Sequence, residues 1–249
     1  MEKIKISVVS YLNSKPFIYG LEHSGILNEI DLQLDIPSVC AQKLIDGKVD
    51  LGLIPVAVIP KLSEKFIVSD YCIGAEGKVA SVMLYSEVPL LQIKTILLDY
   101  QSRTSVTLVK VLAKEYWKIN PQWAATETDF ENSVSGNVAA VIIGDRTFGL
   151  ENKYAYAYDL SEEWEKFTQL PFVFACWVAN KKLSDQFIDS FNQALKYGLN
   201  HRHLLIEELN SKKTYPTDIG VYLTQSIKYN FDDRKKTALE LFLKYCSKL

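Results

Sequence analysis

The stretch LPFVFACWVAN at residues 170–180 decides the fold class of this 249-residue chain. Its nearly unbroken apolar run is typical of a strand that is buried on both faces. A second run of this kind, VASVMLYS, occupies residues 79–86. The segment between the two runs is about 85 residues long, which is enough for a compact subdomain. We therefore predict that both strands cross between one lobe, formed by residues 1–86 and 177–249, and a second lobe, formed by residues 87–176.

On both sides of these strands, short β-like runs alternate with amphipathic helical runs. We expect further strands at residues 3–9, 31–36, 49–59, 94–100 and 137–145, and helices at residues 16–25, 37–48, 106–117, 184–198, 201–209, 218–229 and 232–246. Such alternation predicts an α/β fold with parallel or mixed sheets. By analogy, two α/β lobes that are joined by two crossing strands, with a cleft between them, form a type II periplasmic-binding-protein-like fold.

The overall charge and the apolar pattern exclude several classes of partner. The chain has 28 Lys and Arg against 30 Asp and Glu, a net charge of −2, so no broad attraction to nucleic acid or anionic lipid is expected. No apolar run approaches the roughly 20 residues of a membrane span, and the first residues lack the features of a signal peptide. We therefore expect a cytoplasmic protein that binds neither nucleic acid nor membrane, and that holds any anionic ligand at a local site.

The cysteines and histidines give no sign of a metal site. The four cysteines lie far apart and form no Cys-x-x-Cys pair; although they could form two disulfides, buried thiols are the expectation for a cytoplasmic chain. His201 and His203 are two residues apart, which places them on different sides of a helix, and His23 stands alone. We expect no metal and no cofactor.

The first candidate site is YLNSKP at residues 11–16, which follows the strand expected at residues 3–9. Ligands of open α/β sheets gather at the carboxyl ends of strands, where helix N-termini present free N–H groups. Asn13 offers a donor and an acceptor there, and Tyr11 offers a hydroxyl on a flat apolar face. In the alternative interpretation, Asn13 or Ser14 only caps the helix.

The second candidate site is SRTS at residues 102–105, which opens the helix expected at residues 106–117. Ser102, Arg103, Thr104 and Ser105 place three hydroxyls and a guanidinium in a row. One serine suffices as a cap, whereas hydroxyls, amide N–H groups and an arginine fork together match a carboxylate or phosphate. The alternative is a solvated loop with one capping serine.

Four further residues complete the candidate set. Two of them, Gly144 and Asp145, end the strand expected at residues 137–145; this strand end and the two candidate sites above are the three joints between a strand and a helix. Gly144 permits close backbone approach and Asp145 can cap or orient a neighbour, although a plain turn with an N-cap explains both. Ser81 lies in an apolar strand, and its hydroxyl either bonds the backbone or faces the cleft. Ser38, where the helix expected at residues 37–48 opens, is a further candidate for substrate binding.

The order of these motifs resembles the chorismate dehydratase family of the futalosine route to menaquinone. The resemblance rests on SYLNSKP (10–16), DGKVDLGLIPVAVI (46–59), GKVASVML (77–84), DYQSRTSVTLVKVL (99–112), AAVIIGD (139–145), LPFVFACWVAN (170–180) and YLTQSIKYNF (222–231). It covers essentially the whole chain. Gln169, Phe17 and Ala75 depart from the residues usual in the family, which are Gly, Leu and Ser respectively, and none of them lies at a polar joint.

The resemblance implies that chorismate is dehydrated to 3-[(1-carboxyvinyl)oxy]benzoate without a cofactor. The product ring is aromatic, so the protein has chiefly to fix geometry and to assist the leaving hydroxyl. No histidine lies at the three joints, and we therefore hypothesise that a substrate carboxylate takes the ring proton. Asn13 and Ser81 are then the catalytic contacts, and residues 102–105 hold a carboxylate.

Two other functions fit the same fold. One is a non-catalytic cytoplasmic solute-binding protein for a small carboxylate. The other is the sister lyase of the pathway, which acts on cyclic dehypoxanthinylfutalosine. A homodimer is left open.

Overall fold

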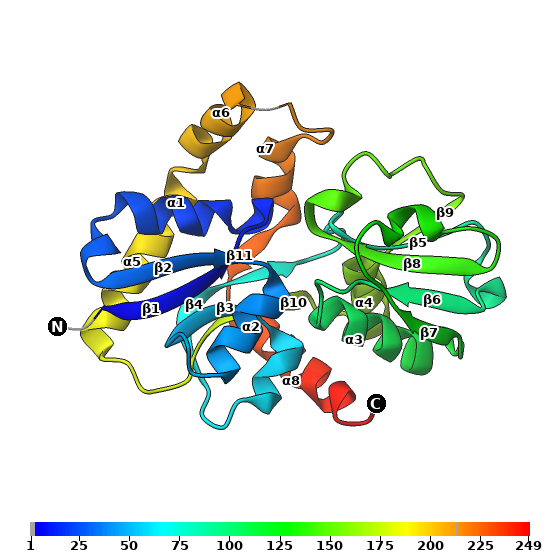
Figure 1. The fold of residues 1–249 in the computed structure, drawn as a ribbon, viewed down its shortest axis with the longest axis horizontal. Helices are drawn as coiled ribbons and strands as arrows, with labels where there is room; N and C mark the ends of the chain where they lie inside the picture. The colour runs from blue at the N-terminus through cyan, green and yellow to red at the C-terminus, as the bar shows by residue number, and fades with distance from the viewer. Residues whose placement is uncertain (1–2, 213) are drawn as a thin grey trace.

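Two β-sheets, each in its own lobe, organise the chain, and a computed structural model describes residues 3–212 and 214–249 of it. The first lobe contains the beginning and the end of the chain, and the second contains the middle (Figure 1). The expected two-lobed α/β architecture is therefore confirmed. Within the described residues, none of the helices is both long and apolar enough to cross a membrane.

The first lobe is built on a six-stranded mixed sheet with the order β11-β4-β10-β3-β1-β2. Its strands are β1 (Ile4–Val9), β2 (Ile30–Asp35), β3 (Leu51–Pro55), β4 (Phe66–Ala75), β10 (Phe172–Ala179) and β11 (Lys228–Asn230). β1 runs parallel to β2 and β3, whereas β10 runs antiparallel to β3 and β4. Every residue of β10 is buried, as its apolar sequence predicts for a strand at the centre of a sheet.

The second lobe is built on a five-stranded sheet with the order β7-β6-β8-β5-β9. Its strands are β5 (Val82–Ser86), β6 (Thr95–Leu98), β7 (Gln122–Ala125), β8 (Val138–Ile143) and β9 (Tyr156–Asp159). β6 is parallel to β7 and β8, and β5 is antiparallel to β8 and β9. The carboxyl ends of β6 and β8 therefore lie together at one edge of this sheet.

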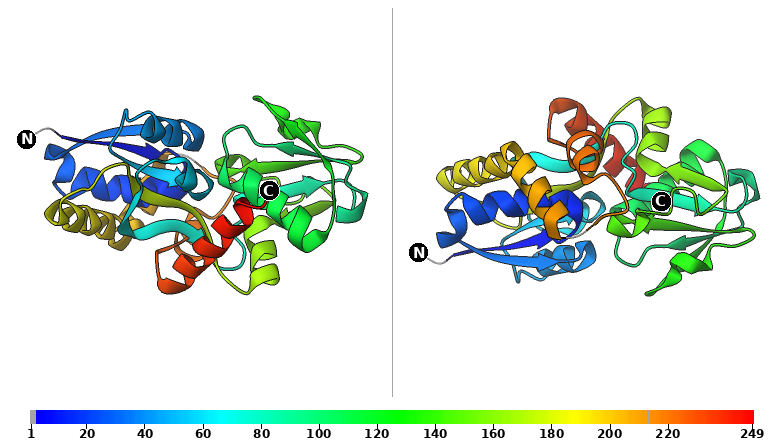
Figure 2. Two further views of the ribbon diagram at one scale, coloured as in Figure 1. Left: turned by 90° about the horizontal axis from the view of Figure 1, so that it is seen from below. Right: turned by 90° about the horizontal axis from the view of Figure 1, so that it is seen from above.

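Helices cover both sheets. They are α1 (Lys15–His23), α2 (Pro37–Ile45), α3 (Thr104–Val111), α4 (Leu160–Thr168), α5 (Asp185–Asn200), α6 (Arg202–Lys212), α7 (Ile219–Val221) and α8 (Asp233–Cys246). Shorter helical turns include η1 (Leu12–Ser14), η3 (Val56–Lys61), η5 (Leu112–Trp117), η7 (Gly144–Thr147) and η8 (Tyr222–Ser226). α1 lies beside α5, and α8 runs under the junction of the lobes, where it contacts β10 and α3 (Figure 2).

Strand pairing places the two segments that connect the lobes outside β5 and β10, the two strands that we expected to cross between the lobes. β5 pairs only within the second sheet and β10 only within the first, so the chain passes between lobes at residues 76–81 and 169–171. The predicted boundaries after residues 86 and 176 assigned β5 to the first lobe and cut β10 in two. An apolar run reports that a strand is buried and does not report which sheet it joins. We propose that the second lobe comprises residues 82–168.

Some strands and turns were not predicted. The strand expected at residues 49–59 ends at Pro55 and continues as η3, because proline cannot donate to a sheet ladder. The helix expected at residues 218–229 divides into α7, η8 and β11. β4, β7 and β9 were missed, since each mixes charged or small residues with its apolar ones. The expectation of buried thiols holds for Cys40, Cys72 and Cys176, whereas Cys246 is half-buried, and all four cysteines are free.

Asp159 fastens the first crossing to the second lobe. Its buried carboxylate accepts the N–H groups of Ser161 (3.0 Å) and Glu162 (3.3 Å) at the start of α4, and those of Val79 (2.8 Å) and Ala80 (2.7 Å) in the crossing. One side chain therefore caps a helix and also holds the segment that carries Ser81.

Removing the Asp159 carboxylate should lower the stability of the protein more than removing an ordinary helix cap. We expect Asp159→Ala to lower the free energy of unfolding by about 2–4 kcal/mol, because four buried donors lose their acceptor. Ser184→Ala is the matched control: Ser184 caps α5 through one bond to Phe187 N (3.3 Å), and its loss should cost about 1 kcal/mol. Urea unfolding of both variants measures the difference. Equal losses in the two variants contradict the proposed anchoring role.

Candidate functional site

A cavity between the two lobes brings together polar residues from all three predicted joints. Seven of the predicted site residues line it, namely Tyr11, Asn13, Ser81, Ser102, Thr104, Ser105 and Gly144. The remaining lining is apolar and includes Leu53, Ile73 and Phe174. The three joints meet because β1 in the first lobe and β6 and β8 in the second present their carboxyl ends to the gap between the lobes.

The other three predicted residues lie outside this lining. Ser38 and Arg103 line a neighbouring groove. Asp145 lies just behind the cavity, where its carboxylate accepts the N–H of Leu12 at 3.2 Å. Since Leu12 belongs to the first lobe and Asp145 to the second, this bond links the two lobes.

The turn at the first joint leaves Asn13 half-buried and buries Ser14 completely. The Ser14 hydroxyl donates to the backbone oxygens of Val9 and Tyr11, and no side chain caps the start of α1. The capping alternative for this joint is therefore wrong. The backbone oxygen of Asn13 accepts the Tyr229 hydroxyl at 2.9 Å, which fixes the turn and leaves the Asn13 amide at the cavity.

A buried tyrosine that sequence reasoning missed organises the catalytic candidates. The Tyr222 hydroxyl donates to the Ser81 hydroxyl oxygen at 2.8 Å. Burial raises the pKa of Tyr222 well above its usual range, so its proton stays in place as a donor. Because Tyr222 fills an acceptor position of Ser81, the hydroxyl hydrogen of Ser81 is left for another acceptor. The alternative in which the Ser81 hydroxyl bonds the backbone is not what the structure shows.

The serines and threonine at the start of α3 divide their roles. Ser102 Oγ accepts the N–H of Ser105 at 3.0 Å, so Ser102 is the helix cap. The Thr104 hydroxyl donates to Phe174 O (3.0 Å) and accepts from Ala57 N (3.3 Å), so it binds the second lobe to the first. Among the described residues, the Ser105 hydroxyl has no hydrogen-bond partner, and it lines the cavity. Ser105 is therefore the residue of this group that is free to contact a ligand.

Gly144 allows the lobes to approach closely. Its φ is +67°, and a Cβ atom there would lie 3.0 Å from the Tyr11 ring. Its N–H donates to Ser81 O at 2.8 Å. A side chain at this position would therefore both strain the backbone and displace Tyr11.

An ion-pair cluster behind the cavity, also missed from the sequence, fastens the second and third joints together. Asp99 is buried and accepts from Arg146 Nη2 at 2.5 Å and from Ile143 N at 3.0 Å. Arg146 Nη1 also donates to Glu131 at 2.6 Å. Burial raises the pKa of Asp99, and the Arg146 guanidinium opposes that shift. The signal available in the sequence was a lone aspartate at the end of an apolar strand.

Several hydrogen bonds join the two lobes around the cavity. Besides the links of Asp145 and Thr104, the Tyr11 hydroxyl donates to Gln101 across the gap. The cavity has a volume of only about 60 Å³, so a ligand of many atoms requires the lobes to separate. Within the described residues, no three His, Cys, Asp or Glu side chains gather as a metal site.

Comparison with known sequences identifies a family. Residues 4–248 match the family model described as menaquinone biosynthesis. A chorismate dehydratase from Thermus thermophilus is 25% identical over 265 aligned residues, which cover 97% of this chain and 94% of that protein. A chorismate dehydratase from Campylobacter jejuni is 26% identical over 251 aligned residues, which cover 97% of this chain and 96% of that protein.

Comparison with solved structures identifies the fold. A protein from Archaeoglobus fulgidus superposes with a TM-score of 0.78 at 13% identity, over 99% of this chain and 97% of that one. A Candida albicans protein described as having the generic periplasmic-binding-protein fold superposes with a TM-score of 0.63 at 13% identity, over 100% of this chain and 91% of that one. The two-lobed architecture is thus a periplasmic-binding-protein-like fold.

Proposed function

The chain belongs to the menaquinone-biosynthesis family, and from that premise we propose that it is a chorismate dehydratase, a lyase that converts chorismate to 3-[(1-carboxyvinyl)oxy]benzoate. Two relatives that match nearly full length carry that name. The observation that carries the proposal is the cavity itself, where the side chains of Asn13, Ser81 and Ser105 face an otherwise largely apolar space between the lobes.

The chemistry of the lining favours a reaction in which the substrate supplies its own base. In the described part of the chain, no carboxylate, imidazole or amine side chain lines the cavity. The ring C–H bond breaks as a substrate carboxylate takes the proton, and its electron pair forms the new ring double bond as the C–O bond to the ring hydroxyl breaks. The newly formed carboxylic acid of the substrate returns this proton to the departing oxygen, which leaves as water. Aromatisation makes the elimination favourable, so the protein chiefly has to position the groups.

Ser81 and Tyr222 assist the leaving group in this proposal. Tyr222 donates to Ser81, and the remaining Ser81 hydrogen points to the leaving hydroxyl of the substrate. A donor held in place before the reaction stabilises charge as it develops on that oxygen, without reorganisation of solvent. Asn13 orients the carboxylate that takes the proton, or the leaving hydroxyl itself.

The start of α3 holds the other substrate carboxylate. Ser105 supplies a free hydroxyl, and the helix N-terminus supplies the positive end of its dipole. Ser102 and Thr104 contribute by fixing this turn, through the cap and through the link to the first lobe.

Parallel incubations separate the three candidate functions. The purified protein is mixed with chorismate or with cyclic dehypoxanthinylfutalosine, and each mixture is followed by liquid chromatography. Aromatic product from chorismate alone supports the proposal. Turnover of the futalosine derivative alone assigns the sister lyase, and binding of chorismate without turnover assigns a solute-binding protein. The cytoplasmic location stays a prediction, and a homodimer stays an open possibility.

The role of Tyr222 has its own test. We expect Tyr222→Phe to lower kcat about tenfold with little change in KM, because the phenylalanine keeps the ring but no longer directs the Ser81 hydrogen. Tyr85→Phe is the matched control, since Tyr85 is also buried and its hydroxyl bonds Thr147 O, outside the cavity. Steady-state kinetics of both variants give the comparison. Equal kcat values in the wild type and Tyr222→Phe would show that Tyr222 is only a packing residue.

A further inference from the structure

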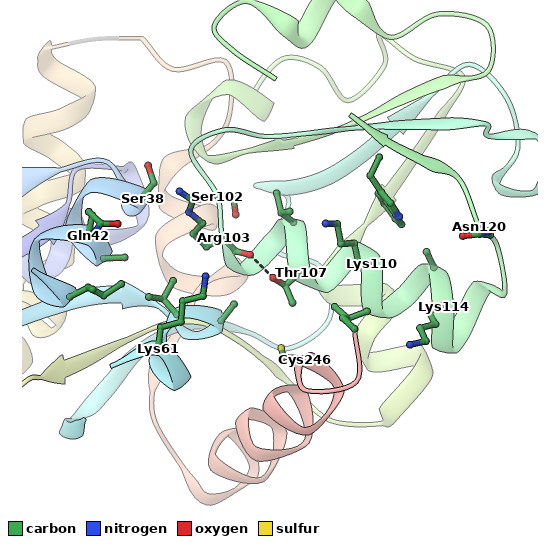
Figure 3. Close-up of a pocket in the computed structure, with 18 of the residues that line it drawn as sticks. Ser38, Gln42, Lys61, Ser102, Arg103, Thr107, Lys110, Lys114, Asn120 and Cys246 are labelled. Atoms are coloured by element: carbon green, nitrogen blue, oxygen red, sulfur yellow. Dashed lines mark hydrogen bonds between the residues drawn. The ribbon is translucent and has the colours of Figure 1, made fainter. Parts of the chain in front are cut away.

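A second hollow between the lobes is strongly basic. It is a groove of about 1130 Å³ formed by α2 and η3 of the first lobe, α3 and η5 of the second, and the end of α8 (Figure 3). Its cationic lining residues are Lys61, Arg103, Lys110, Lys114 and Lys118. Within the described residues, no Asp or Glu side chain lines it. We call this surface the basic groove.

The charges of the basic groove are not neutralised inside the protein. In the part of the chain that the structure describes, none of the five side chains forms an ion pair. Lys114 Nζ donates to the backbone oxygen of Lys248 at 2.6 Å, and Lys110 Nζ lies 5.7 Å from the centre of the Trp123 ring. Both contacts leave the positive charge uncompensated. In a chain of net charge −2, such a concentration of one sign creates a local positive potential between low-dielectric walls.

The basic groove adjoins the cavity. Ser102 lines both spaces, and the next residue, Arg103, lines the groove together with Ser38 (Figure 3). Lys61 from the first lobe and Lys110 from the second extend toward the space between the lobes (Figure 3). The cations therefore stand on both sides of the gap that has to open for a ligand to enter.

We propose that the basic groove is the entrance to the cavity for a small dicarboxylate, which its five cations attract and concentrate. The inference rests on the proposed function, because chorismate carries two carboxylates. A dianion gains from every cation along the groove, and one of them, Arg103, directly follows Ser102, which lines both spaces and accepts the N–H of Ser105 at the start of α3. The negative excess elsewhere on the chain disfavours a long polyanion, which would have to lie across it.

The test compares two double variants. Lys61→Gln with Lys110→Gln removes one cation from each wall of the groove. Lys94→Gln with Lys182→Gln removes two exposed lysines that do not line it. At low ionic strength we expect the groove variant to lower kcat/KM for chorismate about fivefold through KM, with kcat kept, and the control to match the wild type. In about 0.5 M NaCl, where screening acts over roughly 4 Å, the groove variant should approach the wild type.

The possible outcomes separate two proposals, the entrance role of the basic groove and the proposed function of the protein. If the wild type turns over chorismate and the groove variant matches the control at low salt, the groove is not the entrance, and the proposed function is unaffected. A groove variant whose deficit persists unchanged in high salt also overturns the entrance role, because a lost packing contact is not screened. A wild type without turnover overturns the proposed function, and the entrance falls with it.

Discussion

Asn13→Ala should lower kcat for chorismate by about 100-fold or more. Asn13 is the one amide side chain among the described residues that line the cavity, and the proposed elimination depends on the orientation of the groups it contacts. Loss of a single donor aimed at a developing charge typically costs about 3 kcal/mol or more of transition-state stabilisation. Steady-state assays of product formation measure the change.

The design of this experiment keeps folding apart from chemistry. The backbone oxygen of Asn13, which holds Tyr229, is unchanged in the alanine variant, so the melting temperature should stay close to that of the wild type. Asn192→Ala is the control. The Asn192 side chain accepts the Ser69 hydroxyl at 2.7 Å and does not line the cavity, so the kcat of this variant should equal that of the wild type. Full turnover in Asn13→Ala removes Asn13 from the catalytic role, and a rise in KM alone reduces it to substrate binding.

Among the substitutions proposed for this protein, Gly198→Ala should lower the free energy of unfolding the most. α1 and α5 cross at Gly20 and Gly198, where a Cβ atom on Gly198 would lie 1.9 Å from Pro16 O and one on Gly20 would lie 2.1 Å from Ala194 O. Both clashes are with backbone atoms, which cannot rotate away, so the helices would have to separate. We expect the free energy of unfolding to fall by about 3 kcal/mol or more.

Urea unfolding, monitored by circular dichroism, measures this loss. Gly136→Ala is the comparison, because Gly136 has a φ of +52° but open space around its Cβ position; it should cost about 1 kcal/mol for the strained backbone alone. Similar losses in the two variants argue against a close helix crossing. Since α1 begins just after Asn13, the Gly198 variant should also lose activity under conditions in which it remains folded.

The joints were predictable because they follow from sheet topology. The parallel pairing of β6 and β8 carries the polar residues that follow them to one edge of the second sheet, and the packing of the two lobes places the residues that follow β1 opposite that edge. Composition alone marks these residues. Arg103 and Ser105 separate because successive helical residues point about 100° apart. Arg103 therefore lines the groove, whereas Ser105 lines the cavity.

The residues that were missed depend on contacts between distant parts of the chain. Tyr222 and Ser81 are 141 residues apart, and Asp99 and Arg146 are 47 apart, so no local pattern marks either pair. Capping was undecided for a similar reason. Ser14 and Ser102 are the same residue type before a helix, yet only Ser102 caps, because the local backbone turns the Ser14 hydroxyl toward Val9 O.

Mass spectrometry of the product formed from chorismate tests the central claim most directly. If the interlobe cavity dehydrates chorismate, the wild-type protein yields a compound lighter by one water, with an aromatic ring and with its carboxyvinyl ether intact, and Asn13→Ala forms far less of it. Chorismate recovered unchanged, or a product that has lost pyruvate in place of water, would contradict the account.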